Sequence, residues 1–432
     1  MSNVQLAVQF FFQIAVILAF CQVVGWLAKR AGQPQVVAEM LAGVLLGPSL
    51  LGLLWPGVFS KLFPADSMKV LFPVSQLGLA AYMFVVGLEF RMDIVQRRLH
   101  SAVAVSIAGM VTPFVLGAAL GWVFFHHTHL FPPKTSLVEA MIFLGAAMCI
   151  TAFPMLARII HFKKLAGTAM GTIALGAGAI DDAAAWCLLA IVLASFDGDF
   201  SHAIWNIAGG VGYVSLSLWV IRPFLARWAV GIDRRRHLSD GEFVVCLVLL
   251  ALGAWFTDAI GLHAVFGAFI MGVAMPRGLV ARSLIERVQP LTVALLLPMF
   301  FTYSGLNTQI ALLNSAYLWL MTGLVMVAAV GGKGVACWLA ARTTGVSNRD
   351  ALGIGTLMNA RGLMELIIIN IGLQRGIISP ALFATLVIMA VVTTLIASPI
   401  FEWLVGQHRP EAEPEPAETG LSGKSQFTAK SG

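Results

Sequence analysis

The sequence predicts an all-α polytopic membrane protein of about thirteen transmembrane helices, built as an inverted-topology repeat with two crossing discontinuous helices. Three observations support this fold class. The 432 residues are 59% hydrophobic and 11% charged, with a mean hydropathy of +0.88, whereas soluble domains are about 25% charged. Apolar runs long enough to cross a bilayer follow one another along the chain. Finally, segments from the two halves of the chain share residues at a constant offset.

Thirteen apolar runs meet the length that a bilayer demands of a helix, about 20 residues. The first run has no basic segment before it and no small-residue cleavage site, so we expect it to be retained. After Trp403 the sequence turns polar and rich in Pro, Glu, Ser and Gly, so 405–432 are expected to form a disordered cytoplasmic tail. The crossings are predicted near 8–28, 35–54, 70–90, 101–125, 137–159, 166–195, 203–225, 241–257, 260–276, 290–307, 315–341, 350–373 and 380–404.

The basic residues predict the orientation of these crossings. Segments after odd-numbered helices hold eighteen Lys and Arg residues, and segments after even-numbered helices hold four. Because basic loops stay in the cytoplasm, the amino terminus is expected outside and the carboxyl terminus inside a multi-pass cell (inner) membrane. The net charge of +6 is therefore interpreted as topology rather than as a nucleic-acid surface.

A weak internal repeat divides the chain. Trp26, Gly43 and Val44 recur as Trp255, Gly272 and Val273, 229 residues later, and Gly87-Leu88 recurs as Gly305-Leu306. The mates lie seven crossings apart, an odd number, so the two halves run through the membrane in opposite directions. Inverted repeats of this kind are typical of alternating-access transporters. The predicted transmembrane domain is 1–404, with a first repeat near 8–195, a linker helix near 203–225 and a second repeat near 241–404.

The fifth and twelfth crossings are mates in this repeat, and both carry signals for an interruption. The fifth contains Thr151-Ala152-Phe153-Pro154, in which proline removes a backbone donor and clashes with the preceding turn. The twelfth contains Asn359-Ala360-Arg361-Gly362, with an arginine at membrane depth. Freed carbonyls can coordinate a cation there, and half-helix ends carry partial charges. A simple proline kink is the alternative for the fifth crossing alone.

Asp181 and Asp182 are the residues that most need an explanation, since each ionisable group at membrane depth costs at least ~2.5 kcal/mol. Burial and a neighbouring like charge both favour the protonated form of a carboxyl group, so a buried pair can exchange a proton for a cation. We expect a monovalent cation to bind at Asp182 and Asp181. Asp182 is the predicted main ligand and proton carrier, and Asp181 is predicted to modulate it or to pair with Lys333.

Five polar residues besides the aspartates lie at membrane depth and have predicted roles. Thr151 and Asn359 either offer oxygens to the ion or satisfy local backbone groups. Arg361 and Glu365 are four apart on one helix, and an internal salt bridge that stabilises the break is favoured over ion contact. Lys333 lies several residues from the nearest loop charge, so charge compensation in the core is favoured over snorkelling.

The chain resembles the monovalent cation/proton antiporter superfamily, in particular the cation/proton antiporter-2 branch of bacterial sodium/proton and potassium/proton exchangers and plant cation/proton exchangers. The resemblance spans nearly all crossings and rests on these stretches: Gly32-Gln33-Pro34 through Gly47-Pro48, Ile150 to Arg158 (ITAFPMLAR), Ala179 to Trp186 (AIDDAAAW), Gly261 to Gly272, Pro298 to Leu306 and Met358 to Leu366 (MNARGLMEL).

This resemblance implies a homodimer in which a core of helices 4–6 and 11–13 moves like an elevator against helices 1–3 and 8–10. It places the carboxylate pair at Asp181 and Asp182, and the core lysine of electrogenic members at Lys333. Many members carry a nucleotide-binding regulatory domain after the last helix, and none is expected here. Membrane lipids are the other expected partners, with no nucleic acid and no cofactor besides the transported sodium or potassium and protons.

The expected function is exchange of a monovalent cation, sodium or potassium, for protons. A cation channel or uniporter is the alternative, although the sequence shows no filter-like stretch. A membrane enzyme would need a nucleophile or metal-ligand motif, and HExxH and GxSxG are absent from the sequence, so the protein is not expected to be an enzyme. An organic-anion symporter with a similar repeat would not need the carboxylate pair.

Overall fold

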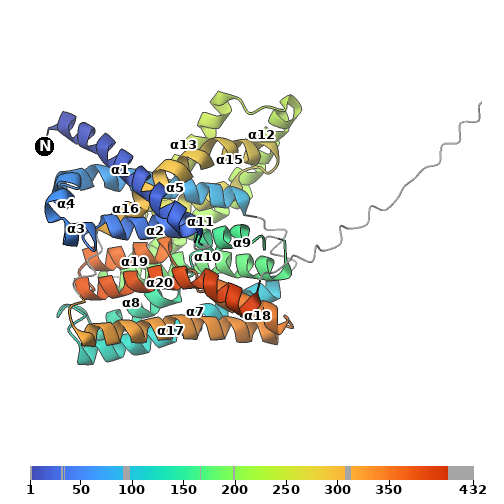
Figure 1. The fold of residues 1–432 in the computed structure, drawn as a ribbon. Helices are drawn as coiled ribbons and strands as arrows, with labels where there is room; N and C mark the ends of the chain where they lie inside the picture. Colours follow the sequence, from blue (N-terminus) through green and yellow to red (C-terminus); the bar gives the residue numbers. More distant parts are fainter. Residues whose placement is uncertain are drawn as a thin grey trace, which may run out of the picture.

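A computed structural model describes residues 2–30, 33, 35–90, 98–165, 167–197, 200–306 and 313–406. The predicted tail lies outside these residues from 407 onward. Within the described ranges all regular secondary structure is helical (Figure 1). The elements are α1 (Asn3–Arg30), α2 (Gln35–Leu46), α3 (Leu51–Leu54), α4 (Pro56–Leu62), α5 (Ala65–Glu89), α7 (Leu99–His127), α8 (Leu137–Cys149), α9 (Phe153–Phe162), α10 (Ala169–Asp197), α11 (Phe200–Leu216), η1 (Ser217–Ile221), α12 (Arg222–Arg235), α13 (Asp240–Ala259), α14 (Ala264–Ala274), α15 (Leu279–Leu291), η2 (Thr292–Leu296), α16 (Leu297–Leu306), α17 (Ala316–Thr343), α18 (Asn348–Leu357), α19 (Leu363–Gln374) and α20 (Pro380–Val405).

The helices agree with the predicted crossings in position and differ from some of them in length. Nine helical segments of the described chain are long and apolar enough to cross a membrane, and α8 and α14 are shorter apolar helices. The crossing predicted at 260–276 is short because Gly261 and His263 have positive φ angles, so α14 begins only at Ala264. The crossing predicted at 290–307 begins earlier, at Leu279, because α15 continues through Pro290 into the π-helical turn η2.

The transmembrane helices pack into two bundles, as predicted. The core consists of α7, α8, α9, α10, α17, α18, α19 and α20, and the scaffold consists of α1, α2, α5, α13, α14 and α16. In Figure 1 α17 lies at the edge of the molecule far from α1 and α5, with the rest of the core between them. The segment α11–η1–α12 follows the last core helix of the first half and precedes α13, which makes it the linker between the two halves.

Two glycine contacts in the scaffold show the inverted repeat in three dimensions. A Cβ on Gly305 of α16 would collide with the backbone of Gly43 in α2, and a Cβ on Gly272 of α14 would collide with the backbone of Phe84 and approach Gly87 in α5. Gly43 and Gly272 are mates in the sequence repeat, and so are Gly305 and Gly87. The same crossing is therefore built twice from matching residues, and each crossing needs glycine because the two backbones touch.

The core packs against the scaffold through a continuous apolar cluster and α2 contacts α20, and two contacts illustrate this boundary. The ring of Phe90, which follows α5, packs edge-on against Phe153 of α9, with centroids 6.0 Å apart, and also contacts Phe269 of α14. The Gln33 side chain donates a hydrogen bond of 2.9 Å to the Leu395 carbonyl of α20. These contacts fix the relative position of core and scaffold in this structure.

Candidate functional site

Two interrupted helices cross at the centre of the core. One crossing stops at Cys149 and resumes at Phe153, and the other stops at Leu357 and resumes at Leu363. The two breaks touch, because the Ala152 amide donates a hydrogen bond of 3.1 Å to the Ala360 carbonyl. Both predicted interruptions are confirmed. Four helix ends with their partial charges therefore meet in one place.

Two buried cations occupy the carboxyl-terminal end of α8. The Arg361 guanidinium donates to the carbonyls of Ala147, at 3.4 Å, and Met148, at 2.7 Å. The Lys333 ammonium donates to the next carbonyl, that of Cys149. The last carbonyls of a helix have no partner within the helix and form its negative pole. Arg361 and Lys333 therefore act as side-chain caps for α8; Lys333 comes from α17, and Arg361 comes from the break between α18 and α19.

Asp181 of α10 is fully buried and is surrounded by donors. The Ser106 hydroxyl of α7 donates to its Oδ1 at 2.6 Å, and the Thr151 hydroxyl, in the break between α8 and α9, donates to its Oδ2 at 2.5 Å. The Lys333 ammonium of α17 lies 3.5 Å from Oδ2, which confirms the predicted pairing. Three different segments thus stabilise Asp181 as a carboxylate.

Asp182, the next residue, has a different environment. It is also fully buried, yet neither of its carboxyl oxygens accepts a hydrogen bond from any residue that the structure describes. Successive side chains on a helix point about 100° apart, so Asp182 does not face the donors that hold Asp181. A buried carboxyl group without hydrogen bonds is costly as a free anion, and a bound proton or a bound cation would remove that cost.

The second charged pair stabilises the other break. Arg361 and Glu365 approach to 3.5 Å, with both side chains buried. The Thr394 hydroxyl of α20 lies 2.8 Å from the Arg361 carbonyl and 3.1 Å from its amide nitrogen. This one side chain therefore binds both backbone groups of Arg361 in the break between α18 and α19. The predicted salt bridge is therefore present, and the bonds from Arg361 to α8 join one broken helix to the other.

The two remaining predicted site residues have different surroundings. Thr151 belongs to the Asp181 cluster, through its hydroxyl. Asn359 lies in the other break, where its amide nitrogen donates 2.9 Å to the Gly355 carbonyl and its side-chain oxygen has no partner among the described residues. Asn359 thus satisfies a local backbone group through its side-chain nitrogen, which was one of its two predicted roles.

Ser106 and Thr394 are site residues that the sequence did not reveal. Ser106 lies in α7, in an apolar stretch where a lone serine most often bonds to a carbonyl of its own helix. The sequence marks this face of α7 only through Gly109, one turn after Ser106. A Cβ at Gly109 would collide with Cys337 of α17 and lie 3.9 Å from the Lys333 side chain. The face of α7 that carries Ser106 and Gly109 is therefore the face that packs against the cluster.

Comparison with known proteins identifies the family. The family model described as "Sodium/hydrogen exchanger, transmembrane" matches residues 14–407. The chain belongs to this family of sodium/hydrogen exchangers. It is 39% identical over 389 residues to the Na(+)/H(+) antiporter NhaS4 of Synechocystis, covering 90% of the exchanger described here and 95% of NhaS4. The expected membership of the cation/proton antiporters is confirmed.

Other relatives of this exchanger carry different cations in their names. The Na(+)/H(+)-K(+) antiporter GerN of Bacillus cereus is 28% identical, with 92% of this chain and 97% of GerN covered. The K(+)/H(+) antiporter 1 of Saccharomyces cerevisiae is 31% identical over 90% of this chain and 46% of the yeast protein. The exchanger spans about half the length of this yeast relative and of the matching Arabidopsis cation/H(+) antiporters.

The fold of the exchanger matches a solved structure. The sodium proton antiporter MjNhaP1 of Methanocaldococcus jannaschii superposes with a TM-score of 0.62 at 14% identity, covering 92% of this chain and 98% of the other. At this identity the match supports the fold alone.

Proposed function

We propose that this protein is a secondary active antiporter that exchanges sodium or potassium for protons, with Asp182 as the ion ligand and proton carrier. The observation that carries the proposal is the asymmetry of the aspartate pair. Asp181 accepts from Ser106, Thr151 and Lys333, whereas the oxygens of Asp182 accept from no described residue. Asp182 is therefore the carboxyl group with oxygens available to a cation or a proton.

Competition for one carboxyl group would couple the two ions. Carboxylate, hydroxyl and carbonyl oxygens are the ligands that suit hard cations. A cation at Asp182 leaves no room for a proton there, and a protonated Asp182 has lost the charge that attracts a cation. Each ion would therefore displace the other on opposite sides of the membrane. Asp181, held by its three donors, would stay ionised and add to the attraction.

The proposed transport step is an elevator movement of the core against the scaffold. The supporting observation is that the four helix ends, Asp181, Asp182 and their partners all lie within the core, so they can move as one body without breaking the site. The names of the relatives, which include sodium and potassium antiporters, support both cations as candidates. A homodimer formed through the scaffold is expected from the family resemblance and stays a prediction for this single chain.

The decisive experiment measures proton movement in proteoliposomes with an internal pH dye while sodium, potassium or lithium is added in turn. We expect a cation-dependent pH change for the wild type and for Asp66→Asn, a carboxylate on the surface of α5. For Asp182→Asn we expect the rate of protein-free liposomes. Undiminished exchange in that variant would contradict the role of Asp182, and cation flux without proton movement would favour a channel or uniporter.

We further propose an inner-membrane orientation with the amino terminus outside and the carboxyl terminus inside the cell. This rests on the distribution of basic residues. An impermeant maleimide added to intact cells is expected to label Lys134→Cys, in the loop before α8, and to leave Arg234→Cys, at the end of α12, unlabelled until the cells are broken. The reverse pattern would invert the topology.

A further inference from the structure

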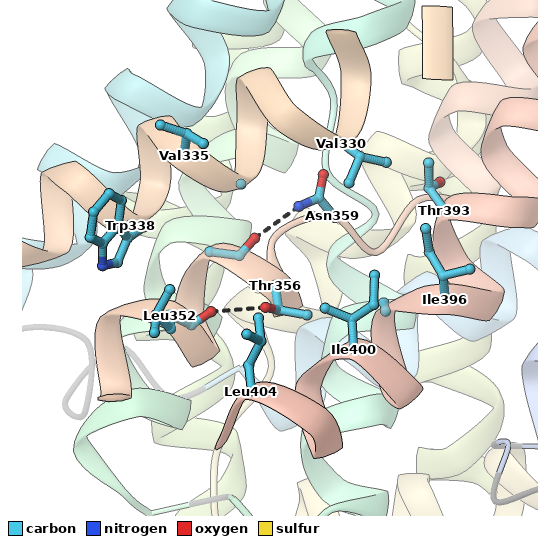
Figure 2. Close-up of a pocket in the computed structure, with 13 residues that line it drawn as sticks. Val330, Val335, Trp338, Leu352, Thr356, Asn359, Thr393, Ile396, Ile400 and Leu404 are labelled. Atoms are coloured by element: carbon cyan, nitrogen blue, oxygen red, sulfur yellow. Dashed lines mark hydrogen bonds between the residues drawn. The ribbon is translucent and has the colours of Figure 1, made fainter. Parts of the chain in front are cut away.

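A cavity of about 190 Å³ lies in the core between α17, α18 and α20. Its wall is made mainly of apolar side chains, among them Val330, Trp338, Leu352 and Ile400, and Asn359 is its most polar residue (Figure 2). One of its walls, α17, lies at the edge of the molecule away from the scaffold (Figure 1). The cavity is separate from the oxygens of Asp181 and Asp182, neither of which lines it.

The exposed residues that line the cavity are apolar and belong to membrane-spanning helices. Val335 of α17 is 51% exposed, and Leu404 of α20 is 36% exposed. Both helices are long apolar spans. A molecule that enters past these residues would therefore come from the lipid phase and would be apolar over most of its surface.

Asn359 supplies the chemical specificity of the cavity. It is only 5% exposed, and its amide nitrogen is committed to the Gly355 carbonyl, which fixes the orientation of the amide group. Figure 2 shows the amide oxygen on the other side of the group, beside Val330. This oxygen has no hydrogen-bond partner among the described residues. A buried acceptor left without a donor is destabilising, because it has lost its hydrogen bonds to water.

The two threonines of the cavity already donate their hydroxyl hydrogens. Thr356 donates to the Leu352 carbonyl at 2.9 Å, and Thr393 donates to the Met389 carbonyl at 2.7 Å. The indole nitrogen of Trp338 donates to Asn348 at 2.9 Å, so the Asn359 oxygen is the lining side-chain atom that lacks a partner among the described residues. A guest that brings one N–H or O–H group would satisfy Asn359, and a guest without a donor would leave the oxygen unpaired.

We propose that this cavity is a binding site for a small, mainly apolar molecule with a single hydrogen-bond donor, which enters from the membrane and donates to the Asn359 side-chain oxygen. An apolar protein cavity of about 150 Å³ is large enough for benzene, so the guest is about the size of one substituted aromatic ring. Its bond to Asn359 would hold the break between α18 and α19 in one conformation. If the proposed exchange is correct, occupancy slows it.

The test uses a benzyl alcohol that carries a diazirine group, with the corresponding methyl ether as the probe that lacks a donor. Purified full-length protein is irradiated with each probe and the labelled peptides are identified by mass spectrometry. We expect labelling on α17, α18 and α20, with the alcohol favoured about tenfold or more over the ether, the ratio that one hydrogen bond supplies. Equal labelling by the ether would overturn the role of Asn359.

Two variants close the cavity without touching the aspartate cluster. Val335→Trp fills its mouth and Ala397→Leu fills its interior, and Val327→Trp is the matched control because Val327 is 71% exposed on the same helix and does not line the cavity. We expect the first two to lose the label and the control to keep it. Unchanged labelling in both filled variants would overturn the proposal, and so would a phospholipid that copurifies with wild type and is lost in Val335→Trp.

A transport measurement separates this inference from the proposed function. In the pH-dye liposomes the alcohol is expected to slow exchange by wild type and by Val327→Trp, and to leave Val335→Trp at its uninhibited rate. An alcohol of this kind does not itself carry protons across the bilayer. Wild-type liposomes without exchange would contradict the proposed function while the labelling result still stood, and exchange that is slowed equally in Val335→Trp would contradict the effect assigned to this site.

Discussion

Asp181 and Asp182 are neighbours in one helix and differ in the number of hydrogen-bond donors that contact their carboxyl oxygens. Hydrogen bonds to a charged group contribute about 1.5–3 kcal/mol each, and Asp181 accepts two from hydroxyl groups beside the contact with Lys333. Asp182 accepts none from the described residues. At the residue scale, the hydrogen bonds favour the ionised form of Asp181, and in the proposed function Asp182 is the carboxyl group that exchanges a proton for a cation.

Ser106 is predicted to position Asp181 without binding the ion itself. In Ser106→Ala the Asp181 carboxylate loses a donor of 2.6 Å in a buried site, so we expect a cation concentration at half-maximal exchange that is raised about tenfold, which corresponds to about 1.4 kcal/mol. Ser106→Thr retains the hydroxyl and should recover most of the affinity. The matched control is Ser75→Ala in α5, where the buried hydroxyl donates to the Phe72 carbonyl of its own helix.

The readout for Ser106 separates positioning from folding. A purely structural role would lower the amount of folded protein and leave the half-maximal concentration of the surviving molecules unchanged. An unchanged half-maximal cation concentration in the folded Ser106→Ala protein would remove Ser106 from the site.

The sequence predicts the site to different depths for different residues. Asp181 and Asp182 stand out because charge is expensive in an apolar run, and the spacing of Arg361 and Glu365 gives their salt bridge directly. Ser106 cannot be found in this way, because its partner lies 75 residues away in sequence and a serine is common in apolar helices. The asymmetry of the aspartate pair is likewise set by three segments that only the fold brings together.

At the scale of the elements, two buried cations contact the carboxyl-terminal end of α8. Its last three carbonyls are contacted by Arg361 and Lys333, which come from the other half of the inverted repeat. Cations at a helix carboxyl terminus stabilise it. Lys333 thus has two simultaneous partners, the α8 terminus and Asp181, and its position does not depend on the aspartate alone.

Removal of Lys333 is expected to destabilise the core. In Lys333→Met the end of α8 loses a cap and Asp181 loses its cation, and breaking a buried pair in this way costs about 3–5 kcal/mol. We expect a clearly lower melting temperature in detergent. Lys69→Met is the control, because Lys69 pairs with Asp66 on the surface, where its side chain is 80% exposed, and no measurable change is expected.

A double variant checks the cause of this loss. Neutralising Asp181 as well, in Asp181→Asn with Lys333→Met, removes the buried unpaired charge and should return part of the lost melting temperature. If the two losses simply add, the lysine stabilises the core through α8 alone and the ion pair contributes nothing.

The two breaks could be predicted from the sequence, because Pro154 in one apolar segment and Arg361-Gly362 in the other are unusual in a transmembrane helix. The sequence did not predict how the breaks are satisfied. The caps of α8 come from residues more than 180 positions away, so no local pattern marks them. The lengths of α14 and α15 were also missed, because positive φ angles at Gly261 and His263 and a π-turn after Pro290 follow from packing.

For the molecule as a whole, the proposed movement requires the contacts between core and scaffold to break. Phe90 and Phe153 form such a contact. In a cysteine-free background, joining Phe90→Cys to Phe153→Cys with a short bifunctional maleimide is expected to stop exchange. The control pair is Thr322→Cys and Thr385→Cys, whose parent hydroxyls lie 3.1 Å apart on α17 and α20 within the core, and this link should leave exchange intact.

The two cross-links give opposite results only if the core moves as a body. Full exchange with the Phe90–Phe153 link in place would contradict the elevator. Loss of exchange with the link inside the core would instead mean that the helices of the core move against one another.

The buried charges of the core have a consequence for its electrical neutrality. Five ionisable side chains of the core are buried among the described residues, namely the carboxyls of Asp181, Asp182 and Glu365 and the cations of Lys333 and Arg361. With all five ionised, three negative groups face two positive ones, so this set of described side chains carries one net negative charge. A single monovalent cation or a single proton brings the set to zero. Because hydrocarbon penalises an uncompensated charge, the proposed movement would be easier for the loaded core than for the empty one, and the flux of one ion would then be conditional on the return of the other.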